Sequence, residues 1–158
     1  MTDQQTKMKI LARQFGELKL KKNMSAFFPD KKNPFMWHIS FKGPEDSEFQ
    51  EGIYHCQMNL ASYPDSPPEV MLLNESGAYV VNTNICIVGL THYHPEGWTP
   101  GTSIEAIVTA LQMLMQITTD RSGYGVIPTI NSSDVKKYSD KSKVFTCKCG
   151  ADHSKLFQ

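Results

Sequence analysis

The feature that most constrains this fold is a series of four short apolar segments with no helical segment between them. The segments cover residues 25–28, 36–42, 53–60 and 69–73. Turn-forming sequences separate them, including Gly43-Pro44 and a proline-rich loop. In the third segment every second residue from Tyr54 to Leu60 is apolar, which is typical of a sheet covered on one face. We therefore expect a four-stranded antiparallel meander with Cys56 in its core.

Three helical segments flank the strands, over residues 3–20, 103–116 and 133–143. Asp3 is the expected N-cap of the first, and Ser132 or Ser133 that of the third. A capping box of Thr102 and Glu105 is expected to open the second, which should be the central core helix. One helix, a run of strands, a long loop and further helices indicate an α+β fold rather than a parallel doubly wound one.

Length and composition fit one globular domain over residues 1–158, with 40% hydrophobic residues. The four cysteines have no framework spacing and no apolar leader follows Met1, so we expect reduced thiols in the cytoplasm. No window has the roughly 18 uninterrupted apolar residues that a membrane span needs. The sequence therefore predicts a soluble chain with no membrane span.

The net charge is zero, but the charges are segregated. Residues 1–22 carry six bases against two acids, whereas residues 23–131 carry eleven acids against four bases. The basic segment is either a solvated helix face or a docking surface for an acidic protein partner. Nucleic acid is disfavoured as a partner, because Phe15 is the single aromatic residue among these bases before Phe27.

The unusual features lie mainly between the strands and the central helix. The loop Tyr63-Pro64-Asp65-Ser66-Pro67-Pro68 is rigid, because proline fixes φ and removes amide donors. Such a loop can present a firm edge to a partner. Cys86 ends an irregular stretch, and Trp98-Thr99-Pro100 lies just before the helix cap.

In this order the landmarks resemble ubiquitin-conjugating enzymes over roughly residues 5–145. The resemblance rests on the basic helix, Tyr-Pro-x-x-Pro-Pro, Asn-x-x-x-Cys-Ile at Cys86, Trp-x-Pro and the core helix. It implies the ubiquitin-conjugating enzyme fold and a Cys86 thioester that carries ubiquitin to substrate lysines. It also implies ubiquitin, its activating enzyme, a RING-type ligase and protein substrates as partners, and no cofactor.

One departure points to a branch of that family. Most members have His-Pro-Asn upstream of the cysteine, but Ala78 stands at the corresponding place here. Cys86 and Trp98 are twelve positions apart, farther than usual. Both features resemble the J-type enzymes, which are tail-anchored in the endoplasmic reticulum membrane and serve protein quality control there. Because the C-terminal anchor of that branch is missing, either the sequence is a piece of a longer protein or this member is soluble.

Further chemistry is expected around Cys86. Attack on the thioester produces an oxyanion, for which Asn82 is the expected donor and Asn74 a poorer one, although either can simply shape a turn. A carboxylate near the cysteine helps to deprotonate the acceptor lysine, and Asp120 is the candidate.

Partner contacts are also implied. Lys9 and Arg13 on the basic helix are expected to meet the ubiquitin-fold domain of the activating enzyme. The remaining partner-binding candidates are Pro64, Pro67, Trp98 and Pro100. Trp98 is expected to have a packed ring and an exposed edge.

Other interpretations remain for the cysteines. Cys86 can be a small buried hydrophobe, or can pair with His92 or His94 as in thiol proteases, which the small size of the chain disfavours. Cys147-x-Cys149 with His153 suggests zinc, but the spacing is tight and a fourth ligand is missing, so two exposed thiols and no metal site are predicted.

Two alternatives at the level of the whole domain also remain. One is an inactive ubiquitin-binding variant of the same fold, which the absence of His-Pro-Asn favours and the presence of Cys86 opposes. The other is an RWD-type interaction domain, which shares the proline loop but needs neither Cys86 nor the Trp-x-Pro turn.

Overall fold

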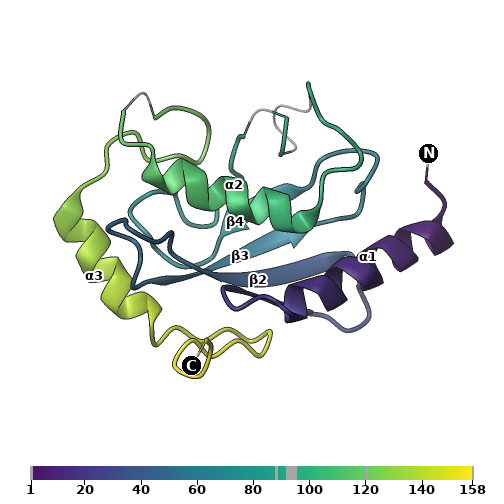
Figure 1. Cartoon of the computed structure of the whole chain (residues 1–158), viewed down its shortest axis with the longest axis horizontal. Helices are drawn as coiled ribbons and strands as arrows, with labels where there is room; N and C mark the ends of the chain where they lie inside the picture. The colour runs from purple at the N-terminus through teal and green to yellow at the C-terminus, as the bar shows by residue number, and fades with distance from the viewer. Residues whose placement is uncertain (1, 88, 92–95, 120, 158) are drawn as a thin grey trace.

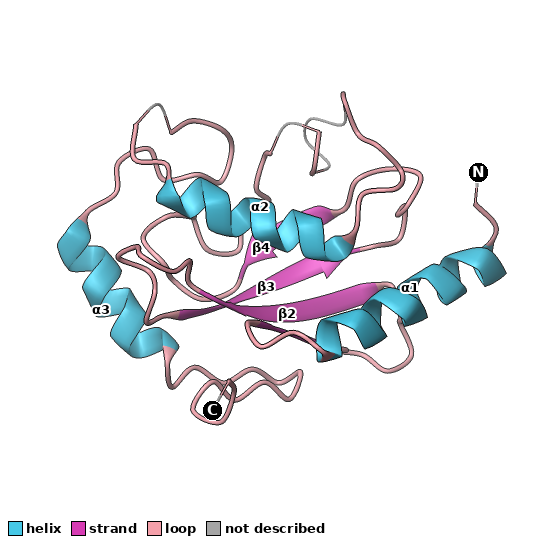
Figure 2. Cartoon of the chain, viewed as in Figure 1, coloured by secondary structure: helices cyan, strands magenta, loops and turns pink. Residues whose placement is uncertain are grey.

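The computed structural model describes residues 2–87, 89–91, 96–119 and 121–157. The elements in chain order are α1 (Gln4–Lys19), β1 (Met24–Phe27), β2 (Met36–Lys42), β3 (Ile53–Asn59), β4 (Glu69–Leu72), α2 (Ile104–Gln116) and α3 (Ser132–Ser142). Helix α2 crosses one face of the sheet, α1 lies along the β1 side and α3 lies at one end of the strands (Figures 1 and 2). The predicted α+β arrangement is confirmed.

The four strands pair in the order β1-β2-β3-β4, and every pair is antiparallel. The meander expected from the turn sequences is therefore confirmed, with strand ends within one residue of the predictions. The register sets Ile39 opposite Cys56 and Ser40 opposite His55. Because side chains alternate along a strand, the first pair faces one side of the sheet and the second pair the other.

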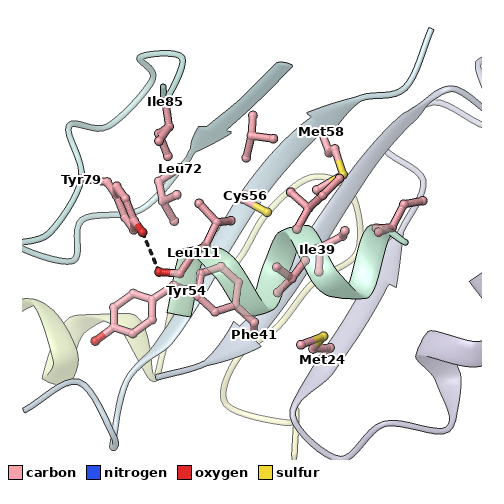
Figure 3. Close-up of a cluster of buried hydrophobic side chains, with 14 of the residues drawn as sticks. Met24, Ile39, Phe41, Tyr54, Cys56, Met58, Leu72, Tyr79, Ile85 and Leu111 are labelled. Atoms are coloured by element: carbon pink, nitrogen blue, oxygen red, sulfur yellow. Dashed lines mark hydrogen bonds between the residues drawn. The ribbon is translucent and has the colours of Figure 1, made fainter. Parts of the chain in front are cut away.

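The core lies between the sheet and α2. Ile39, Cys56 and Leu111 are fully buried within it (Figure 3), which confirms the expected position of Cys56. Burial raises the pKa of the Cys56 thiol to about 12, so this cysteine is a packing residue rather than a nucleophile. Tyr79 also enters the core, and its hydroxyl donates to the carbonyl of Leu111 on α2.

The helix caps are partly as predicted. Asp3 caps α1 by accepting from the Thr6 amide at 2.8 Å, as expected. The predicted capping box at Thr102 is wrong, because Ser103 is the last extended residue and accepts from Ala106 N. The prediction for α3 is wrong in the same way, since Asn131 is its cap. Each error is a shift of one or two residues among neighbouring side chains that can all cap.

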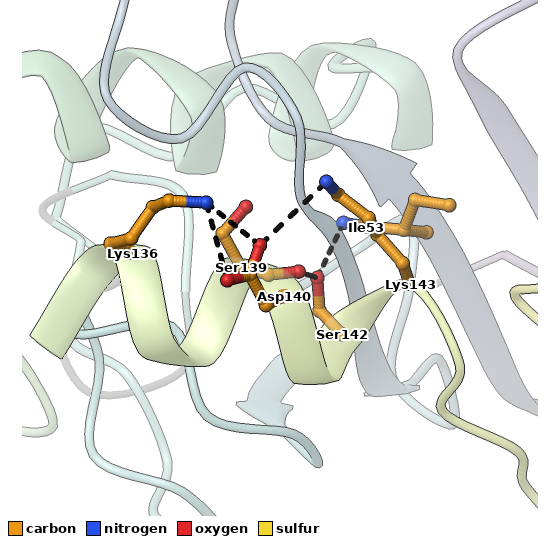
Figure 4. A network of polar contacts seen from close by, with 6 residues as sticks. All are labelled: Ile53, Lys136, Ser139, Asp140, Ser142 and Lys143. Carbon is orange, nitrogen blue, oxygen red and sulfur yellow. Dashed lines mark hydrogen bonds and ion pairs between the residues drawn. The ribbon is translucent and has the colours of Figure 1, made fainter.

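Helix α3 is attached to the start of β3 through Ser142. Its hydroxyl accepts from the Ile53 amide at 3.0 Å and donates to the Ser139 carbonyl at 2.7 Å (Figure 4). Asp140 forms exposed ion pairs with Lys136 and with Lys143, the residue after the helix (Figure 4). The buried bond anchors the helix, whereas the exposed ion pairs contribute little.

The second face of the sheet is also covered, contrary to the expectation of one open face. His55 and Ser40 point away from α2, yet neither has any exposed surface. The segment that follows α3 packs there, with the His55 and Phe145 rings 5.4 Å apart. The polar residue His55 on β3 therefore contacts the segment after α3 rather than solvent.

None of the helices in the described part of the chain is both long enough and apolar enough to cross a bilayer.

Candidate functional site

Cys86 lies on an extended segment beside the edge strand β4. The Ile85 amide donates to the Val70 carbonyl at 2.8 Å, and the Cys86 amide donates at 2.8 Å to the Tyr124 carbonyl on the other side. This alternation is typical of an extended strand. Ile85 is fully buried, whereas Cys86 is half-buried. Ile85 therefore fixes the segment in the core, while Cys86 remains reachable at the surface. The half-buried thiol contradicts the interpretation of Cys86 as a fully buried hydrophobe.

The chain turns immediately after Cys86. The amide of Ile87 donates to the Thr91 hydroxyl at 2.8 Å, and the Thr91 amide donates back to the Ile87 carbonyl at 3.0 Å. Thr91 is fully buried, so the turn has a fixed base. Cys86 thus occupies the end of the extended segment, where the backbone is held on both sides.

A glycine-containing segment forms the wall beside Cys86. Gly123 and Gly125 both have positive φ, at 120° and 78°. A methyl group on Gly125 would lie 2.6 Å from the carbonyl oxygen of Asn84, closer than any ordinary contact. Only glycine allows the two backbones to approach in this way. The wall is therefore fitted tightly against the residues that carry the thiol.

Arg121 holds this wall to the rest of the protein, and the sequence analysis missed it. Its guanidinium donates to the Ile127 carbonyl at 2.8 Å, the Ala78 carbonyl at 2.7 Å and the Ile117 carbonyl at 2.9 Å. It also donates to the Leu114 carbonyl at the end of α2. Arg121 is only 5% exposed. A charged side chain in a loop-like sequence gave no signal that its partners would be backbone carbonyls.

Three asparagines lie between β4 and Cys86, and the fold uses them differently. Asn74 accepts from the His55 amide at 2.8 Å and donates to the Ile53 carbonyl at 3.1 Å, so both ends of its side chain serve β3. Asn82 is exposed and has a left-handed backbone with φ of 57°. The side-chain oxygen of Asn84 is buried and has no hydrogen-bond partner among the described residues. Sequence reasoning did not select Asn84.

The proline loop and Trp98 meet near the start of α2. Trp98 Nε1 donates to the Pro64 carbonyl at 2.9 Å, and the Tyr63 and Trp98 rings are 6.0 Å apart. Trp98 is half-buried, as predicted, and Pro100 is exposed. Pro64 and Pro67 are both buried, so a partner at this loop would meet its exposed residues rather than these rings. The two buried proline rings therefore fix the position of the exposed residues of the loop.

Gln14 joins α1 to this region, and no sequence pattern predicted it. It is buried on the apolar face of α1, where its amide donates to the Tyr63 hydroxyl at 2.7 Å. Its carbonyl oxygen accepts from the Ile104 amide at 2.7 Å. Tyr63 in turn donates to the Thr102 carbonyl. The basic helix is thereby fixed to the first turn of α2.

The basic face of α1 is solvent-exposed. Lys9 and Arg13 are one helical turn apart, and Arg13 faces Glu17 at 3.7 Å in an exposed pair. Such pairs contribute little to folding stability. The charges are therefore available to a partner. Asp120, His92 and His94 lie outside the described residues.

A second cluster of reactive side chains lies on the opposite face of the sheet from α2. Cys147 and Cys149 are half-buried rather than exposed, contrary to the prediction of two exposed thiols. Each sulfur lies beside a histidine, Cys147 Sγ 3.5 Å from His38 Nδ1 and Cys149 Sγ 3.4 Å from His55 Nε2. Burial, followed by the neighbouring histidines, lowers the pKa of His55 to about 3, and burial raises the pKa of Cys149 to about 11.

Comparison with known proteins bears on the Cys86 site. The sequence model of the family described as Ubiquitin-conjugating enzyme matches residues 11–147. Ubiquitin-conjugating enzyme E2 J1 of Homo sapiens is 32% identical over 148 residues, which are 91% of this chain and 45% of that protein. Ubiquitin-conjugating enzyme E2 6 of Eremothecium gossypii is 34% identical over 73% of this chain and 46% of its own length.

A plant relative and a solved structure agree with this match. Ubiquitin-conjugating enzyme E2 32 of Arabidopsis thaliana is 42% identical over 55% of this chain and 28% of that protein. The structure of human Ubiquitin-conjugating enzyme E2 G1 shares the fold, with a TM-score of 0.57, 24% identity and coverage of 68% of this chain and 92% of that one. The chain spans less than half the length of these curated relatives. Its sequence match and its fold nevertheless place it in the ubiquitin-conjugating enzyme family.

Proposed function

We propose that this chain is the catalytic domain of a ubiquitin-conjugating enzyme that carries ubiquitin as a thioester on Cys86. The observation that carries the proposal is the half-buried Cys86, which ends a rigidly held extended segment within the matched family region. A carrier thiol must be reachable by two large partners yet fixed in position. The backbone bonds on both sides of Cys86 meet that requirement.

The first chemical step is transfer between two thiols. The Cys86 thiolate attacks the carbonyl carbon of the thioester that joins ubiquitin to its activating enzyme. A new sulfur–carbon bond forms, the old one breaks, and the thiolate of the activating enzyme leaves. A free thiol, with a reference pKa of about 8.5, is a few per cent ionised at neutral pH, so no dedicated base is needed.

The second step is attack by a lysine amine of the substrate. The amine nitrogen bonds to the thioester carbon, the Cys86 thiolate leaves, and the nitrogen loses a proton. Lysine, with a reference pKa of about 10.4, is mostly protonated at neutral pH, so a nearby carboxylate assists. We assign that role to Asp120, which is adjacent in sequence to the buried Arg121. A ligase and a protein substrate complete the proposed set of partners.

Charging tests the function. The chain is incubated with ubiquitin-activating enzyme, ATP and ubiquitin, and the products are separated with and without reductant. The proposal predicts an adduct that reductant removes. Ubiquitin binding with no adduct would favour the inactive variant of the same fold, and neither binding nor adduct would favour an RWD-type interaction domain.

We further propose that the chain belongs to the J-type branch and acts at the cytosolic face of the endoplasmic reticulum in protein quality control. The absence of His-Pro-Asn and the wide spacing of Cys86 and Trp98 support this, as does similarity to E2 J1. Fractionation of cells that express the natural gene product tests the location. Recovery with endoplasmic reticulum membranes after a salt wash supports it, whereas recovery in the cytosol alone contradicts it.

Charge reversal of Lys9 and Arg13 to Glu is expected to slow charging about 10-fold at low salt and to remove its salt dependence. Exposed charges steer the encounter with an acidic partner and contribute little to folding, so the melting temperature should not change. Reversal of Lys136 and Lys137 on α3 is the matched control, since these lysines are also exposed on a helix. Equal charging rates for both double variants would show that the basic face of α1 is a solvated surface rather than a docking surface.

The role of Asn82 can be separated into backbone and side-chain parts. Its φ of 57° supports the turn interpretation, because asparagine and glycine tolerate this conformation. We expect Asn82→Gly to discharge ubiquitin to free lysine at the normal rate, and Asn82→Ala to lose about 1 kcal/mol of stability. If the Asn82 side chain donates to the oxyanion, its loss should instead slow discharge about 100-fold in both variants.

Asn84→Ala is measured beside these variants in single-turnover discharge assays. A loss of discharge confined to Asn84→Ala would assign the donor to Asn84, whose side-chain oxygen is buried without a partner among the described residues. Melting curves of all three variants separate chemistry from folding.

A further inference from the structure

Four potential metal ligands converge from three separate parts of the chain. His38 lies on β2, His55 on β3, and Cys147 and Cys149 lie on the segment after α3. One ligand atom of each lies within 4.8 Å of the others. His38 is 6% exposed and His55 is fully buried, whereas both cysteines are half-buried, so the cluster is largely shielded from solvent. This cluster is separate from the residues that position Cys86.

The distances match a tetrahedral zinc site. With Zn–N of about 2.0–2.1 Å and Zn–S of about 2.3 Å, tetrahedral geometry separates two nitrogens by about 3.3 Å and a nitrogen and a sulfur by about 3.6 Å. The observed separation of His38 Nδ1 and His55 Nε2 is 3.1 Å. The two nitrogen–sulfur separations are 3.5 and 3.4 Å. These three separations are close to the tetrahedral values, and every other pair lies within 4.8 Å, so the four atoms can surround a single zinc ion.

Hydrogen bonds outside the cluster fix the direction of the His55 ring. The Ser142 carbonyl can only accept, so His153 Nδ1 donates to it at 2.8 Å. His153 Nε2 then accepts from the Ser40 hydroxyl at 2.8 Å. Ser40 Oγ in turn accepts from His55 Nδ1 at 2.8 Å. In a neutral ring this leaves His55 Nε2 with its lone pair pointing at the cluster.

His38 is oriented in the same way. Its Nε2 lies 3.2 Å from the side-chain oxygen Oε1 of Gln57, to which it donates. His38 Nδ1 therefore also presents a lone pair to the cluster, where it faces His55 Nε2 at hydrogen-bond distance. Two lone pairs at this separation repel each other unless a cation lies between them. Fixing the free nitrogen of a ligand histidine by an outer hydrogen bond is typical of metal sites.

The backbone after α3 presents both sulfurs to one side. The Cys147 amide donates to the Ala151 carbonyl at 2.9 Å, and the Gly150 amide donates to the Cys147 carbonyl at 3.0 Å. Gly150 has φ of 105°, which allows this tight turn. Lys148, between the two cysteines, is exposed while both cysteines are half-buried. The turn therefore directs both cysteines toward the protein and Lys148 toward solvent.

We propose that His38, His55, Cys147 and Cys149 bind one structural zinc ion that fastens the segment after α3 to the outer face of the sheet. Binding converts two thiols to thiolates and releases their two protons to solvent, so the dication and two thiolates form a neutral centre suited to burial. Two imidazoles and two thiolates favour zinc over magnesium or calcium, which prefer oxygen ligands. His153 is a positioning residue for His55 rather than a ligand.

Metal content tests the proposal directly. The chain is expressed in zinc-supplemented medium, purified without chelator and analysed by mass spectrometry of its elements. We expect about one zinc per chain. The variant Cys147→Ser/Cys149→Ser should lose it, whereas Cys86→Ser, which removes the thiol of the proposed carrier site, should retain it. This readout does not depend on ubiquitin charging.

A second measurement applies to the unmodified chain and so does not depend on how the variants fold. The chain produced in cobalt-supplemented minimal medium should show thiolate-to-cobalt charge transfer and the strong visible bands of tetrahedral cobalt. Absence of zinc from the unmodified chain together with absence of these bands would overturn the proposal. A disulfide between Cys147 and Cys149, or equal zinc loss in Cys86→Ser, would also overturn it.

Discussion

Replacement of Cys86 by alanine is expected to abolish the ubiquitin adduct completely. In the proposed function the Cys86 thiol supplies the bond that holds ubiquitin, and the other described cysteines are either buried in the core or placed beside histidines on the opposite face. Cys86 does not belong to the buried core cluster, so the melting temperature should stay unchanged. Charging with activating enzyme, ATP and ubiquitin measures the loss.

Cys86→Ser is the companion variant. Its hydroxyl should form an oxyester that survives reductant, because an alkoxide leaves far less readily than a thiolate. Charging of Cys86→Ala at the rate of the unmodified chain would contradict the assignment of the carrier. Loss of charging accompanied by a lower melting temperature would indicate a folding defect instead.

Replacement of Arg121 by alanine is expected to lower the free energy of unfolding by about 3 kcal/mol or more. The substitution removes a buried cation and leaves the carbonyls of Leu114, Ile117, Ala78 and Ile127 without their donor. For a chain of this size, that corresponds to a fall in melting temperature of roughly 6–12 °C. Thermal unfolding followed by circular dichroism measures it.

Arg121→Lys is the matched control, since lysine keeps the charge but lacks the planar fork that reaches several carbonyls. We expect an intermediate loss of stability. Charging by folded Arg121→Ala should also be slower, because the segment that contacts Cys86 loses its attachment. A melting temperature within one or two degrees of the unmodified chain, about 0.5 kcal/mol, would show that the carbonyls do not depend on this side chain.

The sheet was predictable because its signal is local. The alternation from Tyr54 to Leu60 and the turns between segments gave the strands, their antiparallel order and the burial of Cys56. Cys86 was singled out by the order of the landmarks, but its segment was expected to be irregular and is extended instead. Its position depends on backbone bonds to Val70 and Tyr124, which no local pattern reveals.

The polar interior was not predictable in the same way. Gln14 lies on the apolar face of α1 and was passed over, because its partners Tyr63 and Ile104 are distant in sequence. Arg121 binds backbone carbonyls, which every sequence contains. Buried polar groups must be paired, but the sequence does not identify their partners.

The Cys–His cluster shows the same limit. Spacing alone paired Cys147 and Cys149 with the nearby His153. The histidines that contact them are 109 and 94 residues away in sequence. They become neighbours because the β2–β3 register sets His55 opposite Ser40 and next to His38. The polar residues that alternate along β3 indicate this cluster, but only once the second face of the sheet is known to be covered.

The most direct test of the central claim is to locate ubiquitin on the chain. The reductant-resistant adduct of Cys86→Ser is digested with protease, and the peptides are sequenced by mass spectrometry. We predict that the C-terminal glycine of ubiquitin is esterified at position 86. Attachment of ubiquitin to another residue would contradict the account. So would a folded Cys86→Ser chain that forms no adduct although the unmodified chain charges normally.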